Sequence, residues 1–345
     1  MLKPQPHGIG SILKAETLYP DWKNALRTAL RSAKDLVHAG LIAPKEALAY
    51  ERVLARFPLL LPEYYAGLID RNDPLCPIRR QCLPDFSELE LAEGFVNDPL
   101  EDLRHQPAPR ITHRYAGRVL LHLTPNCSMN CRYCFRKNLL NEDRAEFFEG
   151  EVAQAVSYIA DTPEVEEVIF SGGDPFLANE KTLTQVLERL RALPHVKRVR
   201  FHSRVPVTLP MRVDRTFAEL LAAHGKPSVV VCHFNHPREL TLEAKRSVWL
   251  LREAGHTVLN QSVLLRGVND ASAVLCELSE GLFESGVLPY YLHHPDRAQG
   301  TKHYDLPRAR GIEIHTQMRL KLPGYLVPRY VVDDPTCGYK QDITS

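Results

Sequence analysis

Runs of apolar and β-branched residues alternate with helical patterns from residue 118 onward. The six apolar runs cover residues 119–123, 165–170, 196–202, 228–234, 257–265 and 288–293. The helical patterns that follow them cover residues 146–160, 180–193, 214–224, 241–254, 271–285 and 308–320. Because strands that are apolar along most of their length are typical of parallel sheets buried on both faces, this alternation predicts an α/β fold. Six β-α repeats are fewer than the eight of a closed barrel, so we expect a partial, TIM-like (β/α)6 barrel with its chemistry at the carboxyl ends of the strands.

The region before residue 106 has a different pattern. Apolar residues at helical spacing predict one helix over residues 21–38 and a second over residues 44–57. Residues 63–105 suggest short helices with proline-containing connections, and residues 1–20 are expected to be ordered only by docking. We interpret residues 1–105 as an N-terminal helical cap that takes no part in chemistry.

Three cysteines, Cys127, Cys131 and Cys134, have the spacing C-x3-C-x2-C directly after the first apolar run. Thiolates are ligands of iron–sulfur clusters, and three of them are one too few to close a four-iron cluster, which leaves one iron open to a substrate or cosubstrate. The alternatives are a zinc site, a disulfide pair and buried free thiols. A zinc site is disfavoured because His122 is the only further Cys or His nearby, and a disulfide because no secretory signal is present.

Composition and charge restrict the class of protein. The chain has 345 residues, enough for one large α/β domain with an appendage, and its formal net charge is +1. That balance predicts no general attraction to nucleic acid or to anionic membranes. The beginning of the chain lacks the pattern of a signal peptide, and no apolar run reaches membrane-spanning length. We therefore expect a cytoplasmic protein.

The sequence Ser-Gly-Gly-Asp-Pro at residues 171–175 ends the second apolar run. Glycines let the backbone approach a ligand closely, and the amides of Gly172 and Gly173 can meet a carboxylate. Most sequences of this kind are only tight turns. From the residues alone, both a tight turn and a ligand-binding role for Gly172, Gly173 and Asp174 stay open, and the turn lies one strand after the cysteines.

The cysteine spacing, with an aromatic residue before the third cysteine, resembles the signature of the radical S-adenosylmethionine superfamily, and the Gly-Gly-Asp turn resembles its motif for the methionyl group. Further motifs resemble the lysine 2,3-aminomutase family: Thr-His-Arg-Tyr at 112–115, Ser-Arg-Val-Pro at 203–206, His-Phe-Asn-His-Pro at 233–237, Asn-Gln-Ser-Val-Leu-Leu-Arg-Gly-Val-Asn-Asp at 260–270 and Tyr-Val-Val-Asp at 330–333. The resemblance implies three cofactors: a [4Fe-4S] cluster, S-adenosyl-L-methionine and pyridoxal 5'-phosphate.

The resemblance also assigns residues to these cofactors. The three spaced cysteines would hold the cluster, and Lys340 would couple to pyridoxal phosphate through its amine. The other implied cofactor contacts are Arg114, Tyr115, Arg118, His233, Gly172, Gly173, Asp174 and Gln261. The first three are assigned to the phosphate of pyridoxal phosphate and His233 to the neighbourhood of its ring. The residues before Lys340, Thr-Cys-Gly-Tyr, depart from the glycine run that is usual in the family.

Three further residues are implied to bind the substrate. Arg136 matches the arginine that pairs with the substrate carboxylate through its two-point fork. Asp296 and Asp333 match the carboxylates that hold the side-chain ammonium, and two acids at the end of a pocket select a cation. For Asp296 the alternative is an ordinary surface acid. The implied activity is that of an L-lysine 2,3-aminomutase, an isomerase that forms β-lysine by radical 1,2-amino migration.

The chain departs from the larger catabolic members of the family. It ends at Ser345, where they continue into a cysteine cluster, and it has Ala271 where they place a zinc-linked cysteine. The short form resembles the enzymes that supply (R)-β-lysine for modification of elongation factor P, although the tail from Tyr330 is closer to the catabolic type.

We expect three segments: a helical cap over residues 1–105, a radical S-adenosylmethionine partial barrel over residues 106–325, and a C-terminal segment over residues 326–345 that carries the pyridoxal phosphate lysine. The expected partners are L-lysine and a reducing electron-donor protein, and oligomerisation is left open. Three other interpretations also stay open: an aminomutase for another amino acid, a radical S-adenosylmethionine enzyme without pyridoxal phosphate, and an iron–sulfur or redox-sensing protein.

Overall fold

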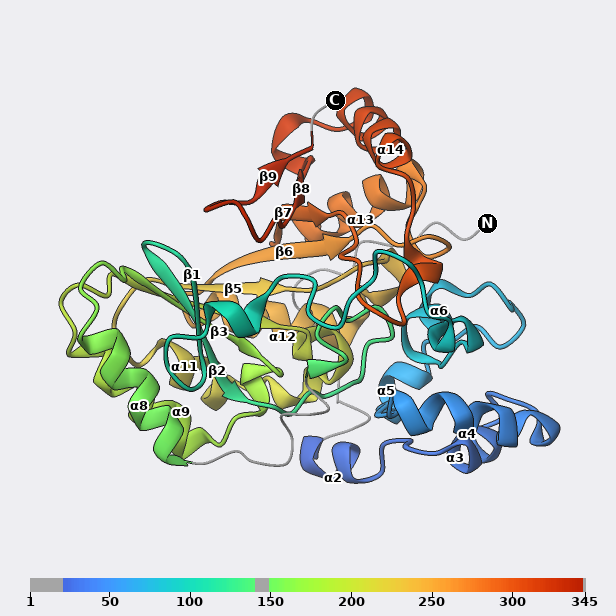
Figure 1. The fold of residues 1–345 in the computed structure, drawn as a ribbon, viewed down its shortest axis with the longest axis horizontal. Coiled ribbons are helices and arrows are strands. Elements are labelled where there is room, and N and C mark those ends of the chain that lie inside the picture. The colour runs from blue at the N-terminus through green and yellow to red at the C-terminus, as the bar shows by residue number, and fades with distance from the viewer. Residues whose placement is uncertain (1–20, 140–148, 344–345) are drawn as a thin grey trace.

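The computed structural model describes residues 21–139 and 149–343. These residues form a mixed α/β structure on one nine-stranded sheet, in which the strands lie side by side in chain order (Figure 1). The strands are β1 Ile111–Tyr115, β2 Arg118–Thr124, β3 Glu167–Gly172, β4 Arg198–Ser203, β5 Ser228–Cys232, β6 Thr257–Val263, β7 Leu288–His293, β8 Arg329–Val332 and β9 Gln341–Asp342. Strands β2 to β8 are parallel, whereas β1 and β9 pair antiparallel with their neighbours at the two edges of this open sheet.

The predicted alternation of strands and helices is confirmed. The six apolar runs form β2 to β7, and the six helical patterns form α8 Glu149–Ala160, α9 Glu180–Arg191, α11 Arg215–Ala222, α12 Leu242–Glu253, α13 Ser272–Glu284 and α14 Arg308–Lys321. The part of the first helical pattern before residue 149 lies outside the described residues. Shorter helical turns are η4 Pro175–Leu177, α10 Val205–Thr208, η5 Pro210–Arg212, η6 Pro237–Glu239, η7 Lys302–Tyr304 and η8 Gly324–Leu326. The strands β1, β8 and β9 were not predicted.

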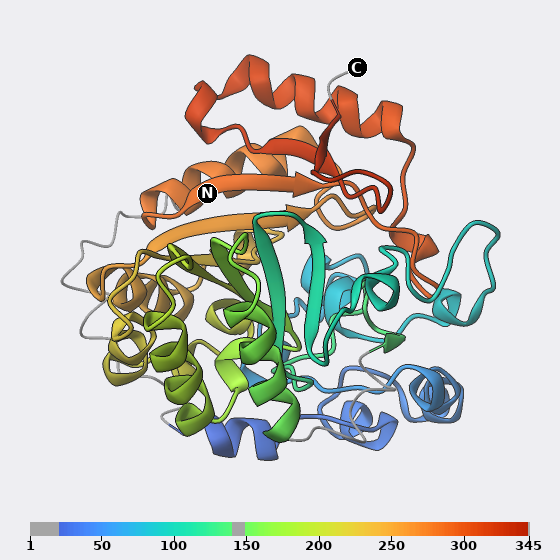
Figure 2. The ribbon, with the colours of Figure 1, turned by 60° about the vertical axis from the view of Figure 1, so that its left-hand side comes forward.

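Helices α9, α11 and α12 begin at polar capping side chains and bury apolar residues on one side. Asp214 caps α11 by accepting from the amide of Phe217 at 2.7 Å, which satisfies a donor that the helix itself leaves unpaired. Phe217 then packs edge-on against Phe176, with 5.2 Å between ring centroids, and Phe176 lies against Phe201 of β4. Figure 2 shows α14 above β7 and β8, where it packs with α13. Among the described residues, every helix is too short or too polar to cross a bilayer.

The N-terminal region consists of short helices, which Figure 1 shows in blue to one side of the sheet. They are α2 Trp22–Arg27, α3 Ala33–His38, η1 Pro44–Glu46, α4 Ala47–Arg56, α5 Glu63–Ala66, α6 Pro77–Cys82, η2 Phe86–Leu89 and η3 Asp102–His105. The prediction of one helix over residues 21–38 was wrong. Leu30 leaves the helix to form a β-bridge with Leu61, and Ser32 with Asp35 then forms a capping box that begins α3. Residues 1–20, expected to be ordered by docking, lie outside the described residues.

Candidate active site

A cavity of about 350 Å³ lies where several parallel strands end. Its lining includes Gly172 at the end of β3, Ser203 at the end of β4 and His293 at the end of β7. All the residues that the sequence assigned to the cluster, to the other cofactors or to the substrate line this one cavity. The structure therefore brings together side chains that lie more than 200 positions apart, from Arg114 to Lys340.

The three cysteines lie on the loop after β2, and this loop is anchored by the N-terminal region. The amide of Asn130 donates to the carbonyl of Leu60 at 3.0 Å, and the amide of Arg132 donates to the carbonyl of Gln81 at 3.0 Å. The guanidinium of Arg132, only 1% exposed, forms an ion pair with the buried carboxylate of Glu88. Since these contacts hold the loop from both sides of Cys131, they fix the backbone that presents the thiols.

Cys127, Cys131 and Cys134 form no disulfide, are partly exposed and line the cavity. Burial raises the pKa of the Cys134 thiol to about 11, and the neighbouring Cys131 adds to the shift, so a positively charged metal centre would offset both effects. Within the described residues, no three His, Cys, Asp or Glu side chains converge as a single metal ion requires. A cluster that takes each thiolate on a different iron does not need such convergence, and the donor set fits it.

The Gly-Gly-Asp turn packs directly on the beginning of the cysteine loop. Gly172 has a φ of +101°, and a Cβ there would lie 2.7 Å from Nδ1 of His122. A Cβ on Gly173 would lie 2.4 Å from the carbonyl oxygen of Asn126, so both positions require glycine. The carboxylate of Asp174 accepts from the Ser203 hydroxyl at 2.7 Å and from the Arg204 amide at 2.7 Å. Asp174 thus joins the ends of β3 and β4.

Lys340 lies beside Asp333 because the chain folds back between β8 and β9. Val332 pairs with Gln341, so the intervening residues form a turn that returns Lys340 to the strand end. The amine of Lys340 and the carboxylate of Asp333 form an ion pair. Burial lowers the pKa of Lys340, and Asp333 opposes that shift; Lys340 and the other nearby cations hold the pKa of Asp333 well below its usual range.

Arg114 and Tyr115, predicted to contact a phosphate, also reach Asp333 in this structure. Nη2 of Arg114 donates to Oδ1 of Asp333 at 2.6 Å, and the Tyr115 hydroxyl donates to the same oxygen at 2.8 Å. Arg118 stacks over the Tyr115 ring, 4.2 Å from its centroid. Arg114 and Arg118 therefore place two cations around Tyr115 at the cavity wall, next to Lys340.

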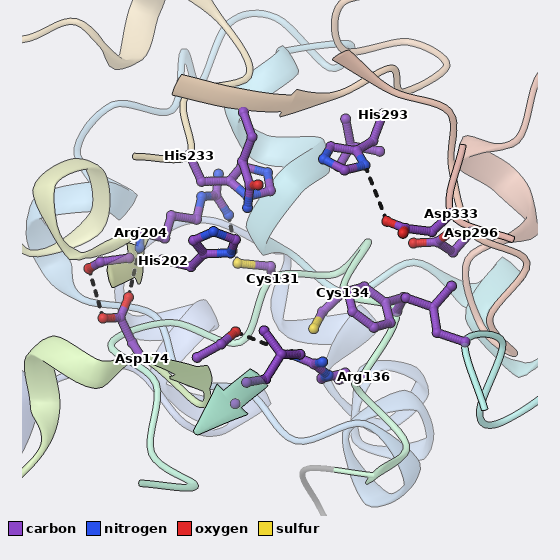
Figure 3. Close-up of a pocket in the computed structure, with 18 of the residues that line it drawn as sticks. Cys131, Cys134, Arg136, Asp174, His202, Arg204, His233, His293, Asp296 and Asp333 are labelled. Carbon is purple, nitrogen blue, oxygen red and sulfur yellow. Dashed lines mark hydrogen bonds and ion pairs between the residues drawn. The ribbon is translucent and has the colours of Figure 1, made fainter. Parts of the chain in front are cut away.

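Asp296 lies next to Asp333, and Figure 3 shows the two carboxylates side by side. Burial raises the pKa of Asp296 to about 7, and the negative charge of Asp333 adds to this shift. The two acids consequently differ at neutral pH: Asp333 is ionised, whereas Asp296 is partly protonated. An incoming cation would favour ionisation of Asp296.

Arg136 is held by a residue that the sequence did not predict. Its Nε donates to Oδ2 of Asp102 at 2.7 Å, and its Nη1 donates to the Ser171 hydroxyl at 3.3 Å. Asp102 belongs to η3 and lines the cavity, so the N-terminal region contributes a side chain to the cavity wall, whereas the expectation that residues 1–105 take no part in chemistry stays a prediction. An acid in a proline-rich segment gives no sequence signal of this role.

Several buried polar atoms at the cavity have no hydrogen-bond partner within the described part of the chain. They are Nε2 of His233, the hydroxyl of Tyr133, Nε2 of His202 and Nε of Arg204. Because an unpaired buried polar group is costly, these atoms are suited to bonds with a bound molecule. His233 was predicted and His202 was not. Gln261, on β6, lines the same cavity.

Comparisons with known proteins agree with this geometry. The 4Fe-4S single cluster domain family matches residues 116–203, which include the three cysteines and the Gly-Gly-Asp turn. A protein of Fusobacterium nucleatum named L-lysine 2,3-aminomutase is 38% identical over 94% of this chain and 76% of its own length. A protein of the same name from Escherichia coli strain K12 is 36% identical to this chain, over 90% of each of the two chains. Another, from Bacillus subtilis strain 168, is 34% identical over 94% of this chain and 69% of its own length. The chain therefore belongs to the lysine 2,3-aminomutase family.

Proposed function

We propose that this chain is an L-lysine 2,3-aminomutase, an isomerase that moves the α-amino group of L-lysine to the β carbon. One observation carries the proposal: a single cavity joins three spaced thiols, a partly buried lysine amine and a pair of carboxylates. The names of the relatives support L-lysine as the substrate. In this proposal residues 106–325 form a partial radical S-adenosylmethionine barrel, and residues 326–345 form the C-terminal segment that carries Lys340.

The residues of the cavity fit three cofactors. Cys127, Cys131 and Cys134 would hold a [4Fe-4S] cluster, and the turn at Gly172 and Gly173, next to the cysteine loop, would receive S-adenosylmethionine. Lys340 would couple to pyridoxal phosphate, with cationic groups near by for the phosphate. When bound, these cofactors supply a carbon radical that removes a hydrogen atom from the substrate and a carbonyl that carries the migrating amino group.

The chain's own residues bind and orient the substrate. Asp333 already pairs with one ammonium, that of Lys340, so its carboxylate is chemically suited to the similar ammonium of a lysine side chain. Asp296 supplies a second carboxylate in the same place. Arg136 is held by Asp102 through Nε, which fixes the plane of its guanidinium for a planar two-point contact with a carboxylate.

Replacing Asp296 with Asn should weaken lysine turnover. A lost charge-assisted contact of a buried cation costs roughly 1.5–3 kcal/mol, or on the order of tenfold to a hundredfold in kcat/KM. Pyridoxal phosphate loading should change less than turnover, because Asp296 acts on Lys340 only through the interaction of their charges and not through a hydrogen bond or salt bridge. Asp333→Asn should also reduce loading, since it removes the partner of Lys340. Steady-state kinetics with lysine, glutamate and arginine measure both effects.

Asp342→Asn is the matched control, because Asp342 pairs with Arg329 on the exposed side of the same hairpin. An exposed pair of this kind contributes about 0–1 kcal/mol, so kcat/KM should be unchanged. Wild-type activity toward glutamate equal to that toward lysine, or no lysine penalty in either cavity variant, would contradict the assignment of the substrate.

The pH dependence of kcat/KM should report Asp296. This carboxyl binds a cation only when ionised, and its pKa is raised to about 7, so kcat/KM for lysine should rise with pH through about 7. Below that pH the decline should approach tenfold per unit. Asp296→Asn should remove this limb of the profile. A wild-type kcat/KM that does not change from pH 6 to 8 would contradict this prediction. The same rise of kcat/KM in Asp296→Asn would show that another group causes it.

A further inference from the structure

Arg204, the residue after β4, donates directly to one of the three spaced thiols. Its Nη1 lies 2.7 Å from Sγ of Cys131, a contact that Figure 3 marks with a dashed line. Arg204 is 8% exposed, and its backbone amide is fixed by Asp174. Both the backbone of Arg204, through Asp174, and its guanidinium, through Cys131, are therefore held in place.

The other side of this guanidinium faces a buried acid. Nη2 of Arg204 donates to Oε1 of Glu239 at 2.9 Å and to Oε1 of Gln81 at 2.7 Å. Glu239, with no exposed surface, also accepts from the Tyr65 hydroxyl at 2.6 Å. The positive end of the pair thus faces Cys131 and the negative end faces away. Tyr65 and Gln81 belong to the N-terminal region, which consequently supports the site here as well as through Asp102 and the anchors of the cysteine loop.

We propose that Arg204, oriented by Glu239, is a positioning residue that raises the reduction potential of the iron–sulfur cluster through its bond to Cys131. The inference rests on the proposed function, in which Cys131 is a cluster ligand. Hydrogen bonds to the sulfurs and low solvent exposure are known determinants of cluster potential. Reduction adds one electron from an external one-electron donor and no proton, so it adds one negative charge beside Arg204. A guanidinium in a site of low dielectric stabilises that charge.

The opposite charges of the pair give opposite predictions. Arg204→Gln removes the positive charge and should lower the midpoint potential. The reduced-to-oxidised ratio at a fixed applied potential should fall on the order of tenfold, which is about 59 mV for a one-electron couple. Glu239→Gln removes the compensating negative charge and should raise the midpoint potential. A purely structural role would loosen the cysteine loop in both variants and would not produce shifts of opposite sign.

Arg212→Gln is the matched control. Arg212 is also buried, at 2% exposure, and stacks 3.5 Å over the Phe217 ring, but it does not line the cavity or contact the three cysteines. The experiment is an anaerobic redox titration of the reconstituted proteins, followed by the electron paramagnetic resonance signal of the reduced cluster. Iron content and thermal unfolding are measured in parallel, so that loss of the cluster is separated from a shift in its potential.

A lower potential in Arg204→Gln and a higher one in Glu239→Gln, with the wild-type value in Arg212→Gln, is the expected result. An unchanged potential in an iron-replete Arg204→Gln variant would overturn the proposal, and so would a Glu239→Gln potential at or below the wild-type value. If Arg204→Gln assembles no cluster, the sign of the Glu239→Gln shift decides. A wild-type chain that binds no iron would contradict the proposed function itself, and this inference with it.

Discussion

Replacing any one of Cys127, Cys131 or Cys134 with Ala is expected to abolish reductive cleavage of S-adenosylmethionine. A cluster on three thiolates has no spare protein ligand, and within the described residues no other Cys lines the cavity. The wild-type chain should bind about four irons after anaerobic reconstitution, as a four-iron cluster requires, and each variant should bind far fewer. Iron analysis and quantification of the cleavage product measure the two effects.

Cys276→Ala is the control for this experiment, because Cys276 lies on α13 away from the cavity. It should retain both the irons and the cleavage activity. Full cleavage activity in a variant that lacks all three spaced cysteines would show that the cluster is held elsewhere or is not needed.

Lys340→Ala is expected to eliminate the covalent attachment of pyridoxal phosphate and all aminomutase turnover. The fold should survive, because Asp333 keeps Arg114 and Tyr115 as partners when the lysine is removed. Lys340→Arg separates charge from reactivity: a guanidinium can pair with Asp333 but cannot take the place of the amine in coupling to the cofactor. Both variants should therefore be inactive, although only the first loses the charge.

Borohydride reduction followed by peptide mapping locates the attachment. The label should be on the peptide that contains Lys340 in the wild type and absent from that peptide in both variants. A label found only on another lysine of the wild type would reject this assignment.

The sequence predicted the parts of the site that depend on short motifs and on strand ends. The cysteine spacing, the Gly-Gly-Asp turn and the lysine near the C-terminus all lie in the cavity because parallel strands place their carboxyl ends together. Their roles as ligands remain predictions. The sequence shows that Asp333 and Lys340 are seven residues apart but not why. The turn between β8 and β9 gives the reason, because it brings Lys340 back beside Asp333.

The residues that support this site could not be predicted, because their contacts form only in the folded chain. Asp102 lies 34 positions from Arg136, and Gln81 lies 123 positions from Arg204. Neither Asp102 nor Gln81 lies in a recognisable sequence motif. The same limit applies to α2 and α3: the break between them depends on a bridge from Leu30 to Leu61 that local helical periodicity does not report.

The most direct test of the proposed function is product analysis with the reconstituted chain. The protein is incubated anaerobically with S-adenosylmethionine, pyridoxal phosphate, a reductant and L-lysine whose α-amino nitrogen carries an isotopic label, with L-glutamate and L-arginine in parallel reactions. We expect β-lysine that retains the label on its β-amino group, and little or no product from the other two amino acids. No β-lysine from a chain that carries both the cluster and the coupled cofactor, or equal product from glutamate, would contradict the account.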